Sequence, residues 1–371
     1  MNRIRYIAVH PFNDFSGSPR VLADFCTAQA IQSQSLTMIT SVRDGFIGQG
    51  GDDKHTIWYP QASWMPWKAL FFIVAQIQCW VMVCFLCIRS RRAGERVVVI
   101  SNTINSMGAM IASRCMGALT VVYIHELASR PQLLKKIAEW VIRQTADEVL
   151  MVSSVIHHHY CLGSCRVSML PNGLRADFSV SPTLDRAAKQ ARGSVLFVGS
   201  LKFYKGVNEF LKIAHKMPEI TFEAVFNCTE RELTQFQFAE NIPHNLQMHA
   251  RHPNLQEKYR RAFVVVNLSL APMCVETFAL TVLEGLSAGC PCVVPPSGGH
   301  LDYFNDGVGR AIDGRDTDGI VGFIRQLRAD RDYWYRCSDN ARRIATDYST
   351  EHYRARVDEF LRVIQHRHFS P

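Results

Sequence analysis

The sequence predicts an α/β protein built from two doubly wound parallel sheets. Short β-branched runs alternate with helical patterns along most of the chain, as in Val97 to Ser101, Ser106 to Met116 and Leu119 to His125. Such alternation is typical of parallel sheets, whose ligands bind at the C-terminal ends of the strands. The 371 residues are enough for two domains with separate cores. A polar, alanine-rich connection from Leu174 to Gly193 separates the two series of strands.

The composition is that of a globular protein, with 47% hydrophobic and 20% charged residues. Lys and Arg outnumber Asp and Glu by 41 to 33, a mild excess that suits polyanionic ligands or an anionic membrane face. The basic residues are scattered and form no aromatic-basic platform, so we expect no nucleic-acid partner. Twelve cysteines and an N-terminus without an export signal predict reduced thiols in the cytoplasm.

In the first half of the chain, two candidate residues follow predicted strands. The loop Pro11 to Pro19 comes after a first strand from Arg5 to His10 and before a helix from about Arg20 to Ile31. Its small residue Gly17 would let a ligand approach the backbone, although a purely structural turn has the same composition. His125 ends a later strand and is the second candidate, with a histidine satisfied by a local carbonyl as the alternative.

The most unusual composition lies between Ala69 and Ile88, where only Gln76 and Gln78 are polar. A helix of this length would reach about 30 Å, the thickness of a bilayer core. Crossing would nevertheless divide the first sheet between the two sides of the membrane. We expect instead that residues 64–92, with tryptophans before the apolar stretch and arginines after it, dock on the inner leaflet. The alternative is a fully buried helix.

The stretch from Glu276 to Glu284 carries the strongest pattern of the chain. Thr277 is an acceptable N-cap, and apolar residues follow at helical spacing from Phe278 to Ala288, until Gly289 stops the helix. The helix is therefore predicted to begin right after Glu276. Its unpaired N-terminal amides would hold a phosphate, and the two glutamates would accept hydrogen bonds from sugar hydroxyls. An amphipathic helix with one capping and one surface glutamate is the alternative.

Together with Ala288-Gly289-Cys290-Pro291 and Ser297-Gly298-Gly299, this pattern resembles the donor-site signature of glycosyltransferase family 4, retaining enzymes of the GT-B fold. The resemblance is strong from Val195 to Ile312 and loose before Pro171. It implies two Rossmann-like domains that face each other across a cleft.

By this resemblance, residues 1–175 form the acceptor-side domain and residues 176–349 the nucleotide-sugar-binding domain, with the helix 350–371 packing back on the first. The implied reaction is the metal-independent transfer of a sugar, with retention, from a UDP- or GDP-sugar. The implied acceptor is a lipid-linked glycan at the inner face of the membrane, in surface polysaccharide or lipopolysaccharide assembly. The donor is a substrate, so no cofactor is expected.

The resemblance also assigns roles to single residues. Glu276 would bind the hydroxyls of the transferred sugar, His125 would contact the same sugar beside the acceptor, and Glu284 would bind the ribose. Lys205 would neutralise the donor diphosphate. The backbone groups expected at the phosphates come from the first loop and from the start of the helix: Gly17, Phe278, Ala279 and Leu280.

Two positions depart from the family's pattern. Ser200 stands where an arginine usually joins Lys205 at the diphosphate, and Lys202 would compensate in part, as a point charge without a bidentate fork. Ala279 stands where glycine is usual, which would alter how closely the backbone approaches the sugar.

No metal site is predicted. The segment Asp316-Thr317-Asp318 resembles the metal-binding D-x-D of another glycosyltransferase class, but its position before a helix predicts an N-cap and a first-turn acid. The histidines and cysteines from His157 to Cys165 lack the paired, separated spacing of structural zinc ligands.

Two other functions stay open. A nucleotide-sugar epimerase of the same fold would form its product without any acceptor. A catalytically silent, membrane-docked assembly component would bind no nucleotide sugar, and the serine at position 200 is the feature that favours it.

Overall fold

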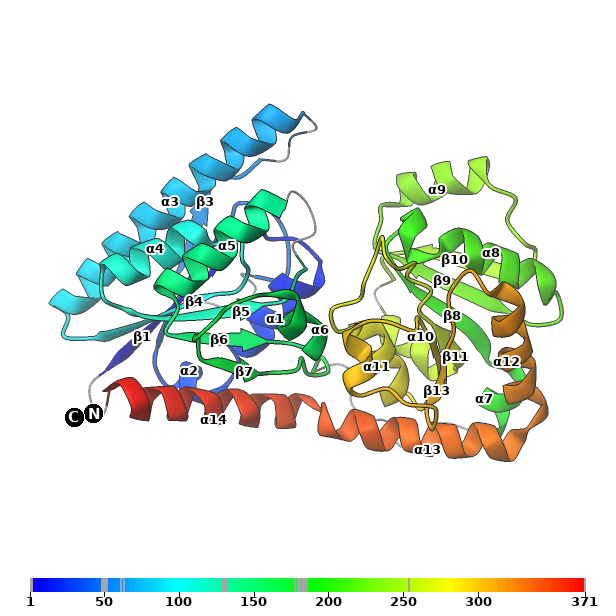
Figure 1. Cartoon of the computed structure of the whole chain (residues 1–371). Coiled ribbons are helices and arrows are strands. Elements are labelled where there is room, and N and C mark those ends of the chain that lie inside the picture. The colour runs from blue at the N-terminus through cyan, green and yellow to red at the C-terminus, as the bar shows by residue number, and fades with distance from the viewer. Residues whose placement is uncertain are drawn as a thin grey trace. The chain divides into compact units, whose positions relative to one another are not determined.

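The computed structural model of the chain describes residues 3–47, 53–60, 62, 64–127, 132–176, 178, 186–252 and 254–369. The chain forms two compact units (Figure 1). The first unit is Met1–Asn172 together with Glu351–Pro371, and the second is Gly173–Thr350. Each unit is built on one parallel sheet, so the prediction of an α/β fold with two doubly wound sheets is confirmed.

Among the described residues, the sheet of the first unit has seven strands in the order β3-β2-β1-β4-β5-β6-β7. Their bounds are β1 (Ile4–His10), β2 (Ser35–Ser41), β3 (Lys54–Ile57), β4 (Arg96–Ser101), β5 (Leu119–Ile124), β6 (Glu148–Met151) and β7 (Val167–Met169). Because β1 pairs in parallel with both β2 and β4, the winding direction reverses beside β1. Open α/β sheets bind ligands at this point, beyond the C-terminal strand ends.

Helices cover both faces of the first sheet. They are α1 (Gly17–Phe25), α2 (Gln29–Gln32), α3 (Met65–Arg92), α4 (Met107–Cys115), α5 (Gln132–Thr145), α6 (Ser154–His159) and α14 (Thr350–Phe369). Helices α3, α4 and α5 lie over one face, and α1, α2 and α14 lie over the other (Figure 1). Ile7 and Val9 of β1 share one buried cluster with Ala75, Cys79 and Val83 of α3. A sheet buried on both faces explains the near-continuous apolar runs of its strands.

Helix α14, at the end of the chain, packs on the first unit. Gln365 Nε2 donates to Tyr6 Oη at 2.6 Å, and Asp358 Oδ1 accepts from the Ala30 amide at 2.7 Å. Leu361 on the same helix is fully buried. Residues 370–371, which the predicted C-terminal helix includes, lie outside the described residues.

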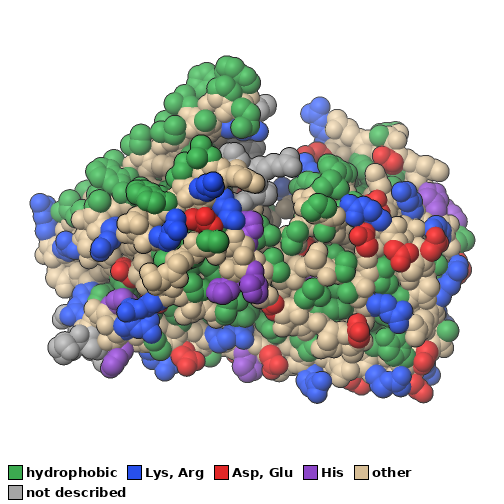
Figure 2. Space-filling view, in the orientation of Figure 1, with side chains coloured by type: hydrophobic (Ala, Val, Ile, Leu, Met, Phe, Trp, Pro, Cys, Tyr) green, Lys and Arg blue, Asp and Glu red, His purple; other side chains and the backbone are tan. Residues whose placement is uncertain are grey.

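Helix α3 is, within the described part of the chain, the one helix long and apolar enough to cross a bilayer by length and composition. One side of α3 packs against the sheet through the buried residues Ala75, Cys79 and Val83. Figure 2 shows hydrophobic side chains along its outer surface. Between 42% and 67% of each of these residues is exposed: Trp64, Met65, Trp67, Leu70, Ile73, Ile77, Trp80, Val81, Phe85 and Ile88. The alternative of a fully buried helix is therefore wrong.

Among the described residues, the sheet of the second unit has six parallel strands in the order β10-β9-β8-β11-β12-β13. Their bounds are β8 (Ser194–Gly199), β9 (Phe222–Phe226), β10 (Leu246–Ala250), β11 (Ala262–Val266), β12 (Cys292–Val294) and β13 (Gly309–Ala311). The helices are α7 (Arg186–Arg192), α8 (Val207–Lys216), α9 (Glu230–Ala239), α10 (Leu255–Arg261), α11 (Leu280–Ser287), α12 (Thr317–Ala329) and α13 (Arg331–Asp347). Two 3₁₀ turns join them, η1 (Phe203–Lys205) and η2 (Gly299–Asp302). Phe197, Phe210, Phe222 and Phe226 form the aromatic centre of the core beneath α8 and α12.

Two predicted elements differ from the structure. The helix expected from Arg20 to Ile31 is split into α1 and α2, because Ala28 adopts an extended backbone conformation that interrupts the helical turns. The connection expected from Leu174 to Gly193 contains α7, while its residues 177 and 179–185 lie outside the described residues. The short strand β3 was not predicted, since its four residues include the polar Lys54 and His55.

Candidate active site

The first cluster of candidate residues surrounds the carboxylate of Glu276 in the second unit. Within the described part of the chain, Glu276 Oε1 accepts three hydrogen bonds. The donors are Lys205 Nζ at 2.6 Å, Ser269 Oγ at 2.5 Å and Asn267 Nδ2 at 3.3 Å. The main chain is also held, since Glu276 O accepts from the Gly299 amide at 2.7 Å. All three side-chain donors bind Oε1, and no donor to Oε2 occurs among the described residues. The second oxygen is therefore available to a hydroxyl.

The surroundings of Glu276 keep it ionised. Burial raises the pKa of the carboxyl, but the Lys205 charge and the hydrogen bonds from Lys205, Ser269 and Asn267 outweigh burial, so that the pKa lies below its ordinary value. For Lys205, burial lowers the pKa, but the charge of Glu276 and the hydrogen bond to it outweigh burial, so that the pKa lies above its ordinary value. Both partners of the ion pair are therefore charged at neutral pH.

A tight turn brings Lys205 to this carboxylate. Strand β8 runs into η1, which ends at Gly206 with a left-handed φ of 83°. A Cβ at Gly206 would lie 2.3 Å from the carbonyl oxygen of Leu268, so only glycine fits here. The Lys-Gly pair noted in the sequence is thus a cation on a turn that requires glycine.

The helix after Glu276 begins later than predicted. Helix α11 starts at Leu280, and Ala279 rather than Thr277 occupies the N-cap, with φ 61° and ψ 64°. The hydroxyl of Tyr303 lies 2.9 Å from the carbonyl oxygens of both Phe278 and Ala279. This contact from a distant part of the chain fixes the turn, which local capping rules could not reveal.

The turn leaves main-chain donors available. Among the described residues, no acceptor contacts the backbone N–H groups of Phe278, Ala279 and Leu280. These amides precede the first full turn of α11, where the helix dipole favours negative charge.

Glu284 lies inside α11 and is 7% exposed. Its Oε2 accepts from Tyr259 Oη at 2.9 Å, and its Oε1 lies 3.5 Å from Arg175 Nε. The Arg175 guanidinium also lies over the Phe178 ring, 4.3 Å from its centroid. The carboxylate is thus engaged by groups of its own unit, and its contact with a ribose stays a prediction.

Ser200 and Lys202 follow β8 directly. Ser200 is half-buried, and its carbonyl oxygen accepts from the Lys202 amide at 2.8 Å. Lys202 is exposed, and its side chain has no ion-pair partner among the described residues. It can therefore turn toward an anion, whereas Lys205 is held by Glu276.

The second cluster lies at the C-terminal ends of β1, β4 and β5 in the first unit. His125 follows β5, and its Nε2 lies 2.9 Å from Oδ1 of Asn102, which follows β4. Because Asn102 Nδ2 donates to Ser18 O at 2.8 Å, its Oδ1 is an acceptor, and the His125 proton belongs on Nε2. His125 Nδ1 is then an acceptor, buried and without a partner among the described residues.

The charge state of His125 limits its chemistry. Burial, assisted by the charge of His10, lowers the pKa of His125 to about 3. The imidazole is therefore neutral at physiological pH. It can accept a hydrogen bond from a hydroxyl at Nδ1, but it holds no proton there to donate.

The neighbours of His125 are also buried. His10 ends β1 with Nε2 3.1 Å from Ser18 Oγ, and burial lowers its pKa to about 4. Glu126 accepts from the Ile104 amide at 2.9 Å, and burial raises the pKa of its carboxyl. Gly17 is the exposed first residue of α1 at the same edge of the sheet.

Sequence reasoning missed three polar residues of these clusters: Asn102, Ser269 and Asn267. Asn102 directly follows β4, and Asn267 directly follows β11. The rule that ligands gather at the C-terminal ends of parallel strands would have selected both asparagines, because each stands first after a buried strand. No local signal marks Ser269, whose role depends on the fold of its loop.

Among the described residues, no group of three His, Cys, Asp or Glu side chains is placed to hold a metal ion. Asp316 caps α12, with Oδ1 accepting from the Gly319 amide at 2.9 Å, so its predicted N-cap role is confirmed. Asp318 pairs with Lys216 at 2.8 Å. Independence of the reaction from metal stays a prediction.

Most of the second unit matches a known family model. Residues 185–344 match the family model described as glycosyl transferases group 1. This segment is similar to the group 1 glycosyltransferases. It contains Lys205, Glu276 and the turn before α11, and the resemblance drawn from the sequence is confirmed at the level of this group.

The chain is also similar to parts of curated enzymes. Over 102 residues the chain is 32% identical to sucrose-phosphate synthase of Zea mays. This alignment covers 27% of the chain and 10% of that enzyme. Over 164 residues it is 25% identical to alpha-galactosylglucosyldiacylglycerol synthase of Streptococcus pneumoniae. This alignment covers 43% of the chain and 42% of the relative. The chain spans about a tenth of the length of the first curated relatives it matches.

Solved structures extend the likeness beyond residues 185–344. HepE of Anabaena in complex with UDP-glucose has a TM-score of 0.77 and 15% identity, covering 97% of this chain and 99% of that one. WaaG, a glycosyltransferase involved in lipopolysaccharide biosynthesis, has a TM-score of 0.68 and 14% identity, covering 96% and 99%. The predicted GT-B fold is confirmed.

Proposed function

We propose that the chain is a retaining, metal-independent glycosyltransferase that moves a sugar from a UDP- or GDP-sugar to a lipid-linked glycan. The acceptor lies at the inner face of a membrane, and the product belongs to a surface polysaccharide. The observation that supports binding of the nucleotide-sugar donor is the ion pair between Lys205 and Glu276. Glu276 lies two residues before the turn at 278–280. This loop system combines a cation, available amides and an ionised carboxylate, as a sugar diphosphate requires.

The candidate groups divide the work of holding and cleaving the donor. Oε2 of Glu276 accepts a hydrogen bond from a sugar hydroxyl, while Lys205 and the amides at 278–280 stabilise the charge of the departing diphosphate. Lys202 supplies a second, mobile cation. In the first unit, Nδ1 of His125 accepts a hydrogen bond from a hydroxyl of the transferred sugar.

The retention proposal follows from how the carboxylates are used. A glycosidase of the retaining type needs one carboxylate as nucleophile and another as acid. Here Glu276 is bound by three donors, and Glu284 is engaged by Tyr259 and Arg175. Oε1 of Glu276 is occupied by its three donors, and Oε2 is assigned to a sugar hydroxyl. Neither carboxylate is therefore proposed as the nucleophile, which favours attack on the face that the diphosphate leaves.

The exposed face of α3 supports the membrane half of the proposal. Ten apolar residues on α3 and at its N-cap are between 42% and 67% exposed, and Arg89, Arg91 and Arg92 follow them for contact with anionic lipid. Strand β3 precedes α3 and β4 follows it in one sheet, so the helix lies on the membrane surface instead of crossing it. The pneumococcal relative, by its name, makes a glycolipid.

Donor binding is tested first, by thermal shift of the whole chain with a panel of UDP- and GDP-sugars. We expect one donor to raise the melting temperature of the wild type and of Lys212→Ala, an exposed lysine on α8, but not of Lys205→Ala. The selected donor is then incubated with a polyprenyl-diphosphate-linked sugar, and transfer is followed by mass spectrometry. Product without acceptor would indicate an epimerase, and no binding of any donor would indicate a non-catalytic component.

Membrane docking is tested by co-sedimentation with phosphatidylglycerol vesicles. The variant with Trp64→Ser and Trp67→Ser should move to the supernatant, because each change removes an exposed indole from the docking face. Phe238→Ser is the matched control, since Phe238 on α9 of the second unit is 88% exposed. Unchanged partition of the double variant would remove this half of the proposal.

A further inference from the structure

A cavity of about 310 Å³ lies in the first unit at the N-terminal ends of β4 and β5. These strand ends are at the edge of the sheet opposite to His125, so the cavity takes no part in the proposed transfer. The end of α3, the start of β4, the turn before β5 and the end of α14 supply its walls. The lining residues used below are Arg91, Glu95, Arg96, Gly117, His368 and Phe369.

Two arginines in this cavity carry charge without a carboxylate partner. Arg91 donates to the carbonyl oxygen of Met116, and Arg96 donates to the carbonyl oxygen of Phe369. The Arg96 guanidinium also lies 5.1 Å from the centroid of the Phe369 ring. Neither arginine forms an ion pair within the described part of the chain. Because a guanidinium has five N–H donors, each keeps donors for an anion.

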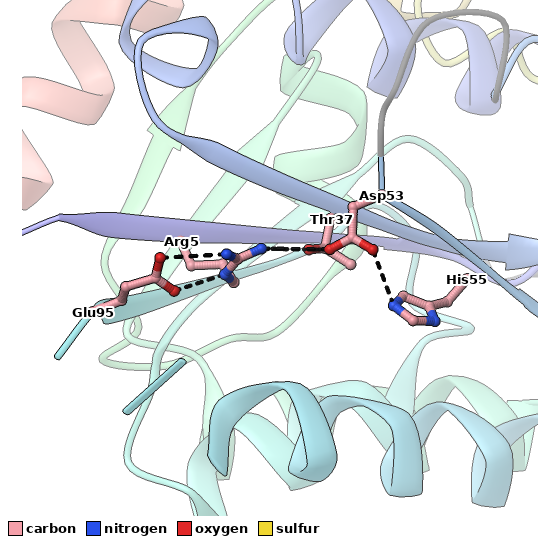
Figure 3. Close-up of polar contacts among 5 residues, drawn as sticks. All are labelled: Arg5, Thr37, Asp53, His55 and Glu95. Atoms are coloured by element: carbon pink, nitrogen blue, oxygen red, sulfur yellow. Dashed lines mark hydrogen bonds and ion pairs between the residues drawn. The ribbon is translucent and has the colours of Figure 1, made fainter. Parts of the chain in front are cut away.

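The one carboxylate in the wall does not neutralise them. Glu95 is bound by Arg5, with Nε at 2.7 Å from Oε2 and Nη2 at 3.3 Å from Oε1. Figure 3 shows Arg5 between Glu95 on one side and Thr37 and Asp53 on the other. The hydrogen bond from Arg5 is the largest cause of the lowered pKa of Glu95. Glu95 is therefore matched by a charge outside the cavity, and Arg91 and Arg96 leave the cavity positive.

We propose that this cavity binds the phosphate of an anionic lipid headgroup. The planar fork of a guanidinium matches the oxygen geometry of a phosphate, and both arginines line the cavity. The lipid source follows from Arg91, which stands three residues after Ile88, the last residue of the exposed apolar face of α3, and therefore on the same side of the helix. A headgroup beside the docked helix would thus reach the cavity. The lipid source rests on the proposed membrane docking, whereas phosphate binding itself does not.

The test compares Arg91→Gln with Arg92→Gln in the full-length protein. Both variants remove one exposed charge from the same helical turn, but Arg92 does not line the cavity. Calorimetry with inorganic phosphate should show binding by the wild type and by Arg92→Gln, and about tenfold weaker binding by Arg91→Gln, the effect of one lost charge-assisted hydrogen bond. Equal affinities in the two variants, or no binding by the wild type, would overturn the phosphate site.

Vesicles then decide the source of the phosphate. Vesicles of phosphatidylcholine alone are compared with vesicles of equal parts phosphatidylcholine and phosphatidylglycerol. Arg91→Gln should lose more of the preference for phosphatidylglycerol than Arg92→Gln does. If it loses phosphate binding yet keeps the wild-type preference, or if the wild type binds phosphate but no vesicle, the headgroup assignment is overturned. Should circular dichroism show that Arg91→Gln is misfolded, Arg96→Gln replaces it with the same expectations.

Discussion

Lys205 Nζ lies 2.6 Å from Glu276 Oε1, so the cation assigned to the donor diphosphate and the carboxylate assigned to the sugar are partners of each other. The pair gives each side chain two functions. Lys205 keeps Glu276 ionised, and Glu276 holds Lys205 at the turn before α8. A donor that draws Lys205 toward its phosphates would still find Glu276 bound by Ser269 and Asn267.

Lys205→Ala should therefore impair turnover far more than folding. We expect turnover of the donor to fall about tenfold or more, because the departing diphosphate loses a cation. The free energy of unfolding should fall by about 1.5–3 kcal/mol, the value of one hydrogen bond to a charged group, since Glu276 keeps two other donors. Initial rates and urea denaturation measure the two effects, with Lys212→Ala as the control. Wild-type turnover in Lys205→Ala would discredit the site.

The ionised state of Glu276 predicts an acid-sensitive contribution to stability. The carboxyl has a folded pKa below its ordinary value of 4.5, so its contribution is present above that pH. This contribution is lost as the pH falls through the lower, folded pKa. Urea denaturation below pH 4.5 should show a steeper loss of stability for the wild type than for Glu276→Gln. Parallel curves for the two proteins would mean that the carboxyl is not held in its charged form.

Burial of two histidines predicts a second pH effect, in the first unit. Burial lowers the pKa of His125 to about 3 and of His10 to about 4, so only the unfolded chain takes up these protons near pH 6. Stability should therefore fall as the pH drops from about 6.5 toward about 4, by about 2 kcal/mol for each histidine between about pH 7 and pH 5. His125→Asn should lose less over this interval than the wild type. The exposed His158→Gln controls for removing any histidine, and an unchanged slope in His125→Asn contradicts the assignment.

The sequence predicts most strands of both sheets, because β-branched runs such as Val97 to Ser101 reflect burial on both faces. It also selects Lys205 and Glu276 as candidates, through the family resemblance, and His125, through its place at the end of a strand. It cannot reveal partners that the fold brings from elsewhere in the chain. Tyr303 sets the start of α11 from 24 residues away, and Tyr259 binds Glu284 from 25 residues away.

The left-handed conformation of Ala279 yields a last prediction. An L-residue at φ 61° costs about 1–2 kcal/mol relative to the right-handed region, and glycine avoids this cost while losing about 0.5–1 kcal/mol of chain entropy on folding. Ala279→Gly also loses a largely buried methyl group, since Ala279 is 7% exposed, so it should change the free energy of unfolding by less than about 1 kcal/mol in either direction. Ala341→Gly, in the interior of α13, should lower it by about 1 kcal/mol or more, because it loses helix propensity and a buried methyl group. Urea denaturation of the two variants beside the wild type provides the measurement. If Ala279→Gly is destabilised as much as Ala341→Gly, the turn does not hold Ala279 in the left-handed region, and the geometry inferred for the amides at 278–280 fails with it.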